Sequence, residues 1–202
     1  IDMFGKEQSV NENDVKEKLL RSACDEFIKH GFKKASIRTI AAGAGVTIGA
    51  LYYFFKNKEE LFLALTEKQA QQFDKLFAKW IEEELEEPSR ASSNEHEMME
   101  FFLNNKEAFI LLTEKAEETK YENYAAQCLD KFTEVCRKFF RKYIEEPDEA
   151  LIALIAQVRF NGIAKIVASD IPDEHKYQLS GYFGEYSEAG FLKLIQICGG
   201  NK

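Results

Sequence analysis

Three glycines lie within one short stretch, Ser36 to Phe55, which reads SIRTIAAGAGVTIGALYYFF. Their spacing, G-x-G-x-x-x-G, is close to that of the loops whose backbone N–H groups cradle the pyrophosphate of a dinucleotide. The same glycines could instead form the turn between two short helices, the second of which is presented to DNA. The first hypothesis predicts an enzyme, and the second predicts a regulator.

The histidines and cysteines show no pattern that is typical of catalysis or metal binding. A di-iron site in a helical bundle needs Glu-x-x-His motifs, but none of the three histidines follows a glutamate at that spacing. The four cysteines form no C-x-x-C pair, so we expect small hydrophobic side chains in a reducing compartment. We therefore expect no metal, no cofactor and no enzymatic activity.

The composition indicates a globular protein made of long helices. Hydrophobic residues make up 45% of the chain and charged residues 31%, and there are only three prolines. No uninterrupted apolar run reaches the roughly 18 residues that span a membrane, and the start shows no signal-peptide pattern. We expect a cytoplasmic protein.

Apolar residues recur at helical spacing along nearly the whole chain. No run has the pattern of a strand, so the sequence predicts an all-α fold. A dinucleotide loop needs a parallel sheet, and its hypothesis fails in this context. A polar segment over residues 86–95 reads as a loop. The expected helices cover residues 13–30, 37–43, 48–55, 58–87, 96–104, 106–117, 121–146, 147–169 and 172–198.

The glycine stretch fits two short helices joined by a tight turn. Ser36 and Thr47 are suited to cap the two helices, and Gly45 is suited to the positive φ of the turn. Leu51 and Phe55, four residues apart, should face back towards the preceding helices. Such a helix–turn–helix carries its second helix into a DNA major groove.

The charge distribution agrees with a polyanion as the partner of the first segment. Residues 1–57 hold nine Lys and Arg against seven Asp and Glu, although the whole chain has a net charge of −8. A mildly basic head, residues 1–57, is joined to an acidic body, residues 58–202. This distribution indicates that the head alone contacts nucleic acid.

The segment AGVTIGALYYFFKNKEELF closely resembles the signature of TetR-family transcriptional regulators, A-G-V-[ST]-x-G-[AT]-L-Y-x-[HY]-F-x-x-K-E-x-L. The preceding ACDEFIKHGFKKASIRTIA matches that family too, so the resemblance covers residues 15–65. It implies a helix–turn–helix DNA-binding domain over residues 10–57 and a helical ligand-binding and dimerisation domain over 58–202. It also implies a ligand-responsive regulator, most often a repressor, that binds a palindromic operator as a homodimer.

The resemblance also implies which side chains meet DNA. The sequence departs from the family pattern at Phe54, where His or Tyr is common. It also departs at Gly43, where a glycine costs about 1 kcal/mol of helix propensity. The residues that the resemblance places against phosphates or bases are Ser36, Arg38, Thr47, Ile48, Gly49, Ala50, Tyr52, Tyr53 and Lys58.

The last two expected helices have the features of a dimer interface. The segment 147–169 is apolar on nearly every face, so it must be covered on more than one side. In the resembling family the last two helices of each chain form a four-helix bundle with a second copy. We expect Gly181, Gly184 and Gly190 to permit close helix approach in the final helix.

Polar and aromatic residues of the body are candidates for binding a small apolar or aromatic effector. Arg159 is either an anchor for an acidic ligand group or one half of a salt bridge. The aromatic residues either line a cavity or form plain core. An alternative is a helical module for protein interaction or small-molecule binding that does not bind DNA. The candidate ligand-binding residues are Phe102, Phe109, Tyr121, Tyr124, Cys128, Phe132, Gln157, Arg159 and Asn161.

Overall fold

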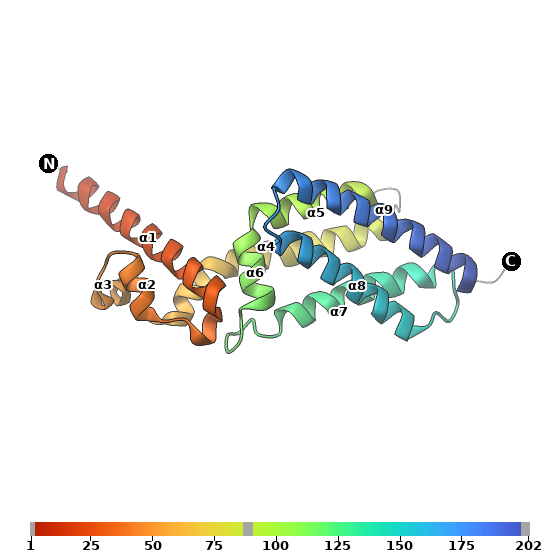
Figure 1. Ribbon diagram of the computed structural model, residues 1–202, viewed down its shortest axis with the longest axis horizontal. Coiled ribbons are helices and arrows are strands. Elements are labelled where there is room, and N and C mark those ends of the chain that lie inside the picture. Colours follow the sequence, from red (N-terminus) through yellow and green to blue (C-terminus); the bar gives the residue numbers. More distant parts are fainter. Residues whose placement is uncertain (1–2, 87–90, 199–202) are drawn as a thin grey trace. The chain divides into compact units, whose positions relative to one another are not determined.

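The computed structural model describes residues 3–86 and 91–198, and every element in them is a helix. The all-α prediction is confirmed. In chain order the helices are α1 (Met3–Lys34), α2 (Ile37–Gly43), α3 (Ile48–Phe54), α4 (Lys58–Glu86), α5 (Ala91–Asn104), α6 (Lys106–Glu114), α7 (Tyr124–Arg141), α8 (Glu149–Ala168) and α9 (Asp173–Cys198) (Figure 1).

The chain divides into two compact units, and the division differs from the expected domain boundary at residues 57 and 58. The first unit runs to Gln71 and also includes Glu107–Tyr124. The second unit consists of Gln72–Lys106 and the chain from Ala125 onward. Helix α4 therefore contributes its first half to one unit and its second half to the other.

The core of the first unit is built from the inward faces of α1, α2, α3, α6 and the start of α4. Phe27 of α1 and Phe62 of α4 are fully buried, and their rings meet edge to face with centroids 5.3 Å apart. Further core residues with no exposed surface are Leu19, Ala23, Ile40, Leu51, Leu61 and Leu111.

The segment after α5 joins the first unit because it satisfies the end of α1. Gly31 interrupts α1 with a φ of 73°, as expected for a helix end, and frees the next residues to bond elsewhere. The Phe32 N–H donates to the Lys115 carbonyl oxygen at 2.9 Å. Lys33 Nζ pairs with Glu117 at 2.8 Å, and the exposed pair holds the pKa of this lysine above its usual value.

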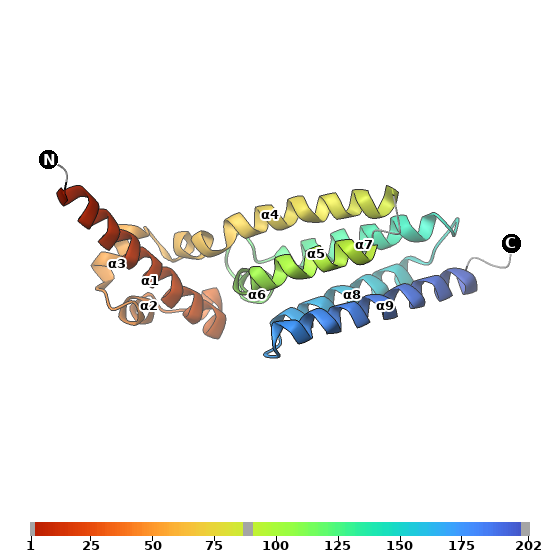
Figure 2. The ribbon, with the colours of Figure 1, turned by 90° about the horizontal axis from the view of Figure 1, so that it is seen from above.

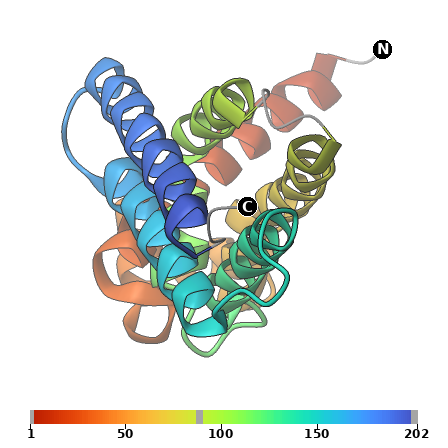
Figure 3. The ribbon, with the colours of Figure 1, turned by 90° about the vertical axis from the view of Figure 1, so that its right-hand side faces the viewer.

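The second unit is a bundle in which α5, α7, α8 and α9 run lengthwise beside the second half of α4 (Figure 2). Helices α8 and α9 lie side by side, as the end-on view shows (Figure 3). Contacting aromatic rings from different helices fill the interior. These pairs are Phe77–Phe132 at 4.9 Å, Phe73–Phe102 at 5.1 Å, Phe140–Phe191 at 5.4 Å and Phe132–Phe160 at 5.7 Å between centroids.

Helix α8 buries one face and exposes apolar side chains on another. Ile152, Ala156 and Phe160 point into the bundle, whereas Leu154 and Val158 are 58% and 49% exposed. By length and composition alone α8 could cross a membrane. Its apolar run is interrupted by Gln157, Arg159 and Asn161, as the sequence indicates, and the core helix of a globular protein meets the same criterion.

Several element boundaries differ from the sequence-based expectations. Helix α5 begins at Ala91, so the expected loop over 86–95 is shorter, and its residues 87–90 lie outside the described residues. Pro147 is not in the first turn of α8. Asp148 caps that helix instead, because its carboxylate accepts from the N–H groups of Ala150 at 2.8 Å and Leu151 at 3.3 Å.

Candidate nucleic-acid interface and ligand cavity

Helices α2 and α3 form a helix–turn–helix. Their axes differ by 95°, and residues 44–47 connect them. The Ser36 hydroxyl accepts from the Thr39 N–H at 3.3 Å, and the Thr47 hydroxyl accepts from the Ala50 N–H at 3.1 Å. Gly45 has a φ of 69°. The two predicted caps and the predicted turn are confirmed.

The packing of α3 decides which of its side chains can reach a partner. Leu51 is fully buried and Phe55, just after the helix, is nearly so; together they fix the helix against the core. The opposite face therefore points outward. Its exposed residues are Ile48, Gly49, Tyr52 and Tyr53, of which Tyr53 is 72% exposed, while Ala50 is half-buried beside them.

Packing explains why a glycine occupies position 43, where it departs from the family pattern. A Cβ at this position would lie 2.3 Å from Oγ of Ser22 on α1. Ser22 cannot easily turn away, because its hydroxyl donates to the Ile40 carbonyl oxygen at 2.9 Å. The glycine thus allows α2 to lie close against α1, which offsets its weak helix propensity.

Two carboxylates that the sequence analysis missed hold this region together. Glu26 is buried, and its Oε1 accepts from the Ser36 N–H at 2.9 Å, which fixes the start of α2. The Tyr53 hydroxyl donates to Glu12 Oε1 at 3.3 Å and ties the end of α3 to α1. Neither contact has a local sequence signal, since the partners are 10 and 41 residues apart.

The basic residues expected at phosphates differ in their surroundings. Arg38 is exposed on α2. Lys58 is half-buried, and its ammonium lies 4.5 Å from the Phe32 ring centroid. It also donates to the carbonyl oxygens of Lys33 at 3.2 Å and Ala35 at 3.4 Å. Lys58 therefore satisfies backbone groups at the C-terminal end of α1 in addition to any role at DNA.

Residues 19–65 match the family model described as bacterial regulatory proteins of the TetR family. The matched segment contains both short helices, the turn and the start of α4. The helix–turn–helix segment of this chain is therefore similar to the DNA-binding domain of the TetR family.

Individual relatives match over the same N-terminal segment. The "Probable acrEF/envCD operon repressor" of Escherichia coli K12 is 40% identical over 48 residues, which cover 24% of this chain and 22% of that curated relative. The structure of PfmR, a TetR-family regulator from Thermus thermophilus, covers 84% of this chain and 92% of its own, with 19% identity and a TM-score of 0.55. At that identity the likeness shows the fold.

A second structural neighbour carries bound molecules. AibR, crystallised with isovaleryl coenzyme A and operator DNA, covers 85% of this chain and 97% of its own. The identity is 17% and the TM-score is 0.57. It shares the helical architecture with this chain.

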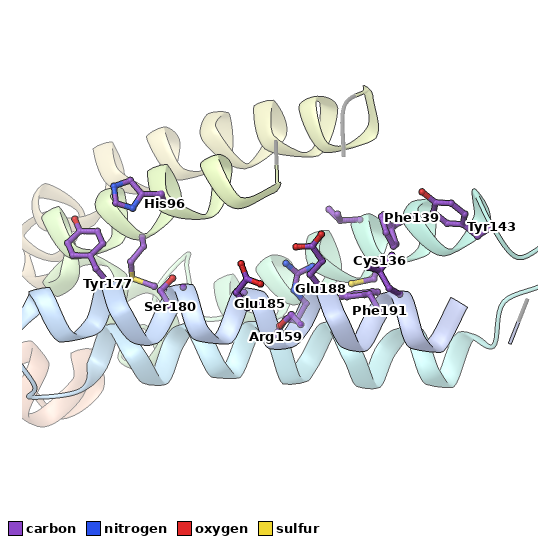
Figure 4. A pocket seen from close by; sticks show the side chains of 16 residues that line it. His96, Cys136, Phe139, Tyr143, Arg159, Tyr177, Ser180, Glu185, Glu188 and Phe191 are labelled. Atoms are coloured by element: carbon purple, nitrogen blue, oxygen red, sulfur yellow. The ribbon is translucent and has the colours of Figure 1, made fainter. Parts of the chain in front are cut away.

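The second unit contains a partly enclosed cavity of about 280 Å³. Helices α5, α7, α8 and α9 form its wall (Figure 4). His96 and Tyr177 lie at one end, where their ring centroids are 5.4 Å apart, and Phe139 and Tyr143 lie towards the other. Burial and, less strongly, nearby Glu100 and Asp173 raise the pKa of the Tyr177 phenol, so its hydroxyl is neutral at physiological pH.

The nine residues expected to bind a ligand are not brought together. Arg159 is the one member of that set in the wall of this cavity. Gln157 and Asn161 are exposed, because residues four apart share a helix face and Arg159, midway between them, points elsewhere. The remaining six are divided between buried positions of the second unit (Phe102, Cys128 and Phe132) and the first unit (Phe109, Tyr121 and Tyr124).

Arg159 enters the cavity from α8 and lies near an aromatic ring. Its guanidinium carbon lies 5.3 Å from the ring centroid of Phe191 on α9. Glu185 and Glu188 appear on either side of it in Figure 4, and both are exposed. Among the side chains that the structure describes, no carboxylate lies within 4.0 Å of Arg159, so no ion pair to this residue forms there. A salt bridge to a second copy of the chain stays a prediction.

Glycines of the last two helices play a different part from the expected one. A Cβ on Gly181 would meet nothing within 4 Å, although this residue lines the cavity. Gly184, one turn later, lines it as well. The close helix approach occurs at Gly162 of α8, where a Cβ would lie 2.4 Å from the Phe183 ring. Two of the α9 residues that line the cavity therefore contribute no side chain to its wall.

The cysteines and acidic groups form no metal site in the described parts of the chain. Cys128 and Cys136 are buried, as expected of hydrophobic residues, but Cys198 is exposed. Burial, with smaller effects of Glu107 and Asp25, raises the pKa of Cys24 to about 11 and keeps it a thiol.

Proposed function

We propose that this chain is a cytoplasmic transcriptional repressor of the TetR family that binds a palindromic operator as a homodimer and responds to a small apolar or aromatic molecule. The observation that carries the DNA-binding part is α3, a short capped helix that is fixed by Leu51 on one face and exposed on the other. An isolated helix of this length would not be stable in water, so its rigid packing favours a role in recognition.

The exposed face of α3 supports direct contact with bases. Gly49 lets the backbone approach the groove, and Ile48 and Ala50 are suited to contact thymine methyl groups. Around them, hydroxyls, backbone N–H groups and side-chain cations are suited to phosphate oxygens. These flanking groups are those of Ser36, Arg38, Thr47, Tyr52, Tyr53 and Lys58.

The exposed apolar face of α8 and α9 supports a homodimer. Leu154, Val158, Tyr182 and Tyr186 are each between 49% and 71% exposed, which is unusual for large apolar side chains on one pair of helices. A second copy would cover them. The two heads would then meet half-sites about 34–36 Å apart, one turn of DNA.

The cavity of the second unit supports an effector site. AibR, which shares the fold, was crystallised with both an acyl coenzyme A and operator DNA. Helix α4 belongs to both units of this chain, so it is the element through which occupancy of the cavity would reach the head. If a ligand binds the dimer about a hundredfold more tightly at one distance between the two DNA-binding domains than at another, the difference is about 2.7 kcal/mol. This difference would change operator occupancy substantially.

The DNA-binding proposal is tested by selecting bound sequences from a random duplex pool with the purified protein. We expect a palindromic consensus. Ala50→Glu should abolish binding to it, because a carboxylate would face the groove, whereas Ala64→Glu, an exposed change on α4, should not. If the protein retains no duplex at low salt, the alternative of a helical module without DNA binding is favoured.

A further inference from the structure

We propose that the cavity of the second unit binds a small monocarboxylic acid with an apolar body, that Arg159 is its anchor, and that the site rejects coenzyme A thioesters and other polyanions. The effector role of such an acid rests on the proposed function. Its binding does not, because binding can be measured without DNA.

The size and lining of the cavity fit the body of such a molecule. Its volume of about 280 Å³ has room for on the order of ten non-hydrogen atoms, taking the ~30 Å³ of a water molecule for each. Met99 and Phe191 are buried in the wall, and Val135 and Phe139 are half-buried. Burying an alkyl or aryl group among these side chains would supply most of the affinity.

Arg159 provides a single recognition point for an anion. The guanidinium carbon lies 5.3 Å from the centroid of the Phe191 ring, and the N–H groups form a planar fork of donors. The described chain offers them no carboxylate within ion-pair distance. A carboxylate is the ligand group that matches this fork of donors with two parallel hydrogen bonds.

The acidic residues in the wall limit how much negative charge the ligand can carry. Glu185 and Glu188 both line the cavity, while Arg159 is the one Lys or Arg among its described lining residues. A monocarboxylate adds one charge, which Arg159 matches. The phosphates of coenzyme A would place several further charges beside the two glutamates without a cation to balance them.

The test is calorimetric titration of the full chain with four probes: 4-phenylbutyrate, octanoate, 4-phenylbutanol and octanoyl coenzyme A. We expect both acids to bind at least about tenfold more tightly than the alcohol, and the thioester not to bind. The two acids separate an aryl from an alkyl body as the preferred shape.

Variants assign the preference to Arg159. Arg159→Gln should remove the acid-over-alcohol preference and leave alcohol binding within about twofold, and Arg159→Lys should restore part of it. Lys165→Gln removes an exposed cation from the same helix as a control and should change nothing. Gly181→Leu should weaken all binding probes by filling the cavity.

Several results would overturn the proposal. They are equal binding of acid and alcohol, binding of the thioester, an unchanged acid preference in Arg159→Gln, or no probe binding to a folded protein. Melting temperatures of all variants show whether each is folded. Retained operator binding in any of these cases would leave the proposed function standing while this inference fails.

Discussion

Single side chains decide how closely the recognition elements approach the rest of the first unit. Gly43 faces Ser22 across the contact between α2 and α1, and the serine hydroxyl is held by the Ile40 carbonyl oxygen. A methyl group at position 43 would have to displace that hydroxyl and break its hydrogen bond. The closeness of the two helices thus depends on a pair of small residues.

We expect Gly43→Ala to lower the free energy of unfolding by about 1–3 kcal/mol through overpacking, although alanine is the better helix former by about 1 kcal/mol. In a Ser22→Ala background the obstructing oxygen is gone, and the same change should become neutral or stabilising. Urea denaturation of the two single variants and the double variant measures the coupling. A stabilising Gly43→Ala in the otherwise unchanged protein would show that α2 shifts freely.

For single side chains, contacts between residues close in sequence were predictable, and contacts between residues far apart in sequence were not. The caps at Ser36 and Thr47 were predictable, because each side chain bonds to a backbone N–H three residues later. The support from Glu26 and the opposition of Ser22 to Gly43 were not, because they depend on how two helices meet. The same limit explains why Arg159 alone, of nine expected ligand residues, lies in the cavity wall.

At the scale of single helices, the glycines of α8 and α9 differ in what a Cβ atom at their positions would contact. Gly162 opposes the Phe183 ring, while Gly181 opposes nothing within 4 Å. Both lie inside helices, where alanine is preferred to glycine by about 1 kcal/mol. Their surroundings, and not their propensities, should therefore decide the effect of the same substitution.

We expect Gly162→Ala to lower the melting temperature, because the new Cβ on α8 would overlap the Phe183 ring of α9. Gly181→Ala, the matched control, should raise stability by about 1 kcal/mol. Differential scanning calorimetry of the two variants tests the contrast. Equal stabilisation by both would mean that Phe183 adapts without cost, and the close contact would then have no structural importance.

The types of the elements were predictable from periodicity, but only some of their first and last residues were. Helix α4 was expected to start at Lys58 and does so. Helix α7 ends at Arg141, earlier than its apolar pattern indicates, because Tyr143 and Ile144 continue the spacing without continuing the helix. The assignment of Glu107–Tyr124 to the first unit had no sequence signal at all, since it depends on backbone groups at the end of α1.

For the whole molecule, the exposed apolar face of α8 and α9 should determine the oligomeric state. We expect Val158→Asp to convert the proposed homodimer into a monomer of about 23 kDa, because a carboxylate at a covered apolar position loses its hydration. Ile48→Asp makes the same kind of change on α3. It should leave the dimer intact and abolish operator binding.

Sedimentation equilibrium at micromolar concentration, together with operator binding, separates the two variants. The Val158→Asp monomer should bind the operator far more weakly, since each half-site would be bound alone. A wild-type chain that sediments as a monomer would contradict the proposed dimer. A dimer that persists in Val158→Asp would place its interface on another face.

The missing side chains at Gly181 and Gly184 have a consequence for how such a regulator can diverge. Gly181 leaves part of the cavity wall without a side chain, so a change of this one residue would alter the cavity volume without repacking the bundle. The new side chain would extend towards empty space and would also strengthen the helix, so selection for a new cavity shape would not conflict with selection for folding. Duplicated copies of this gene could therefore diverge in the molecules that fit the cavity while their helix–turn–helix stays the same.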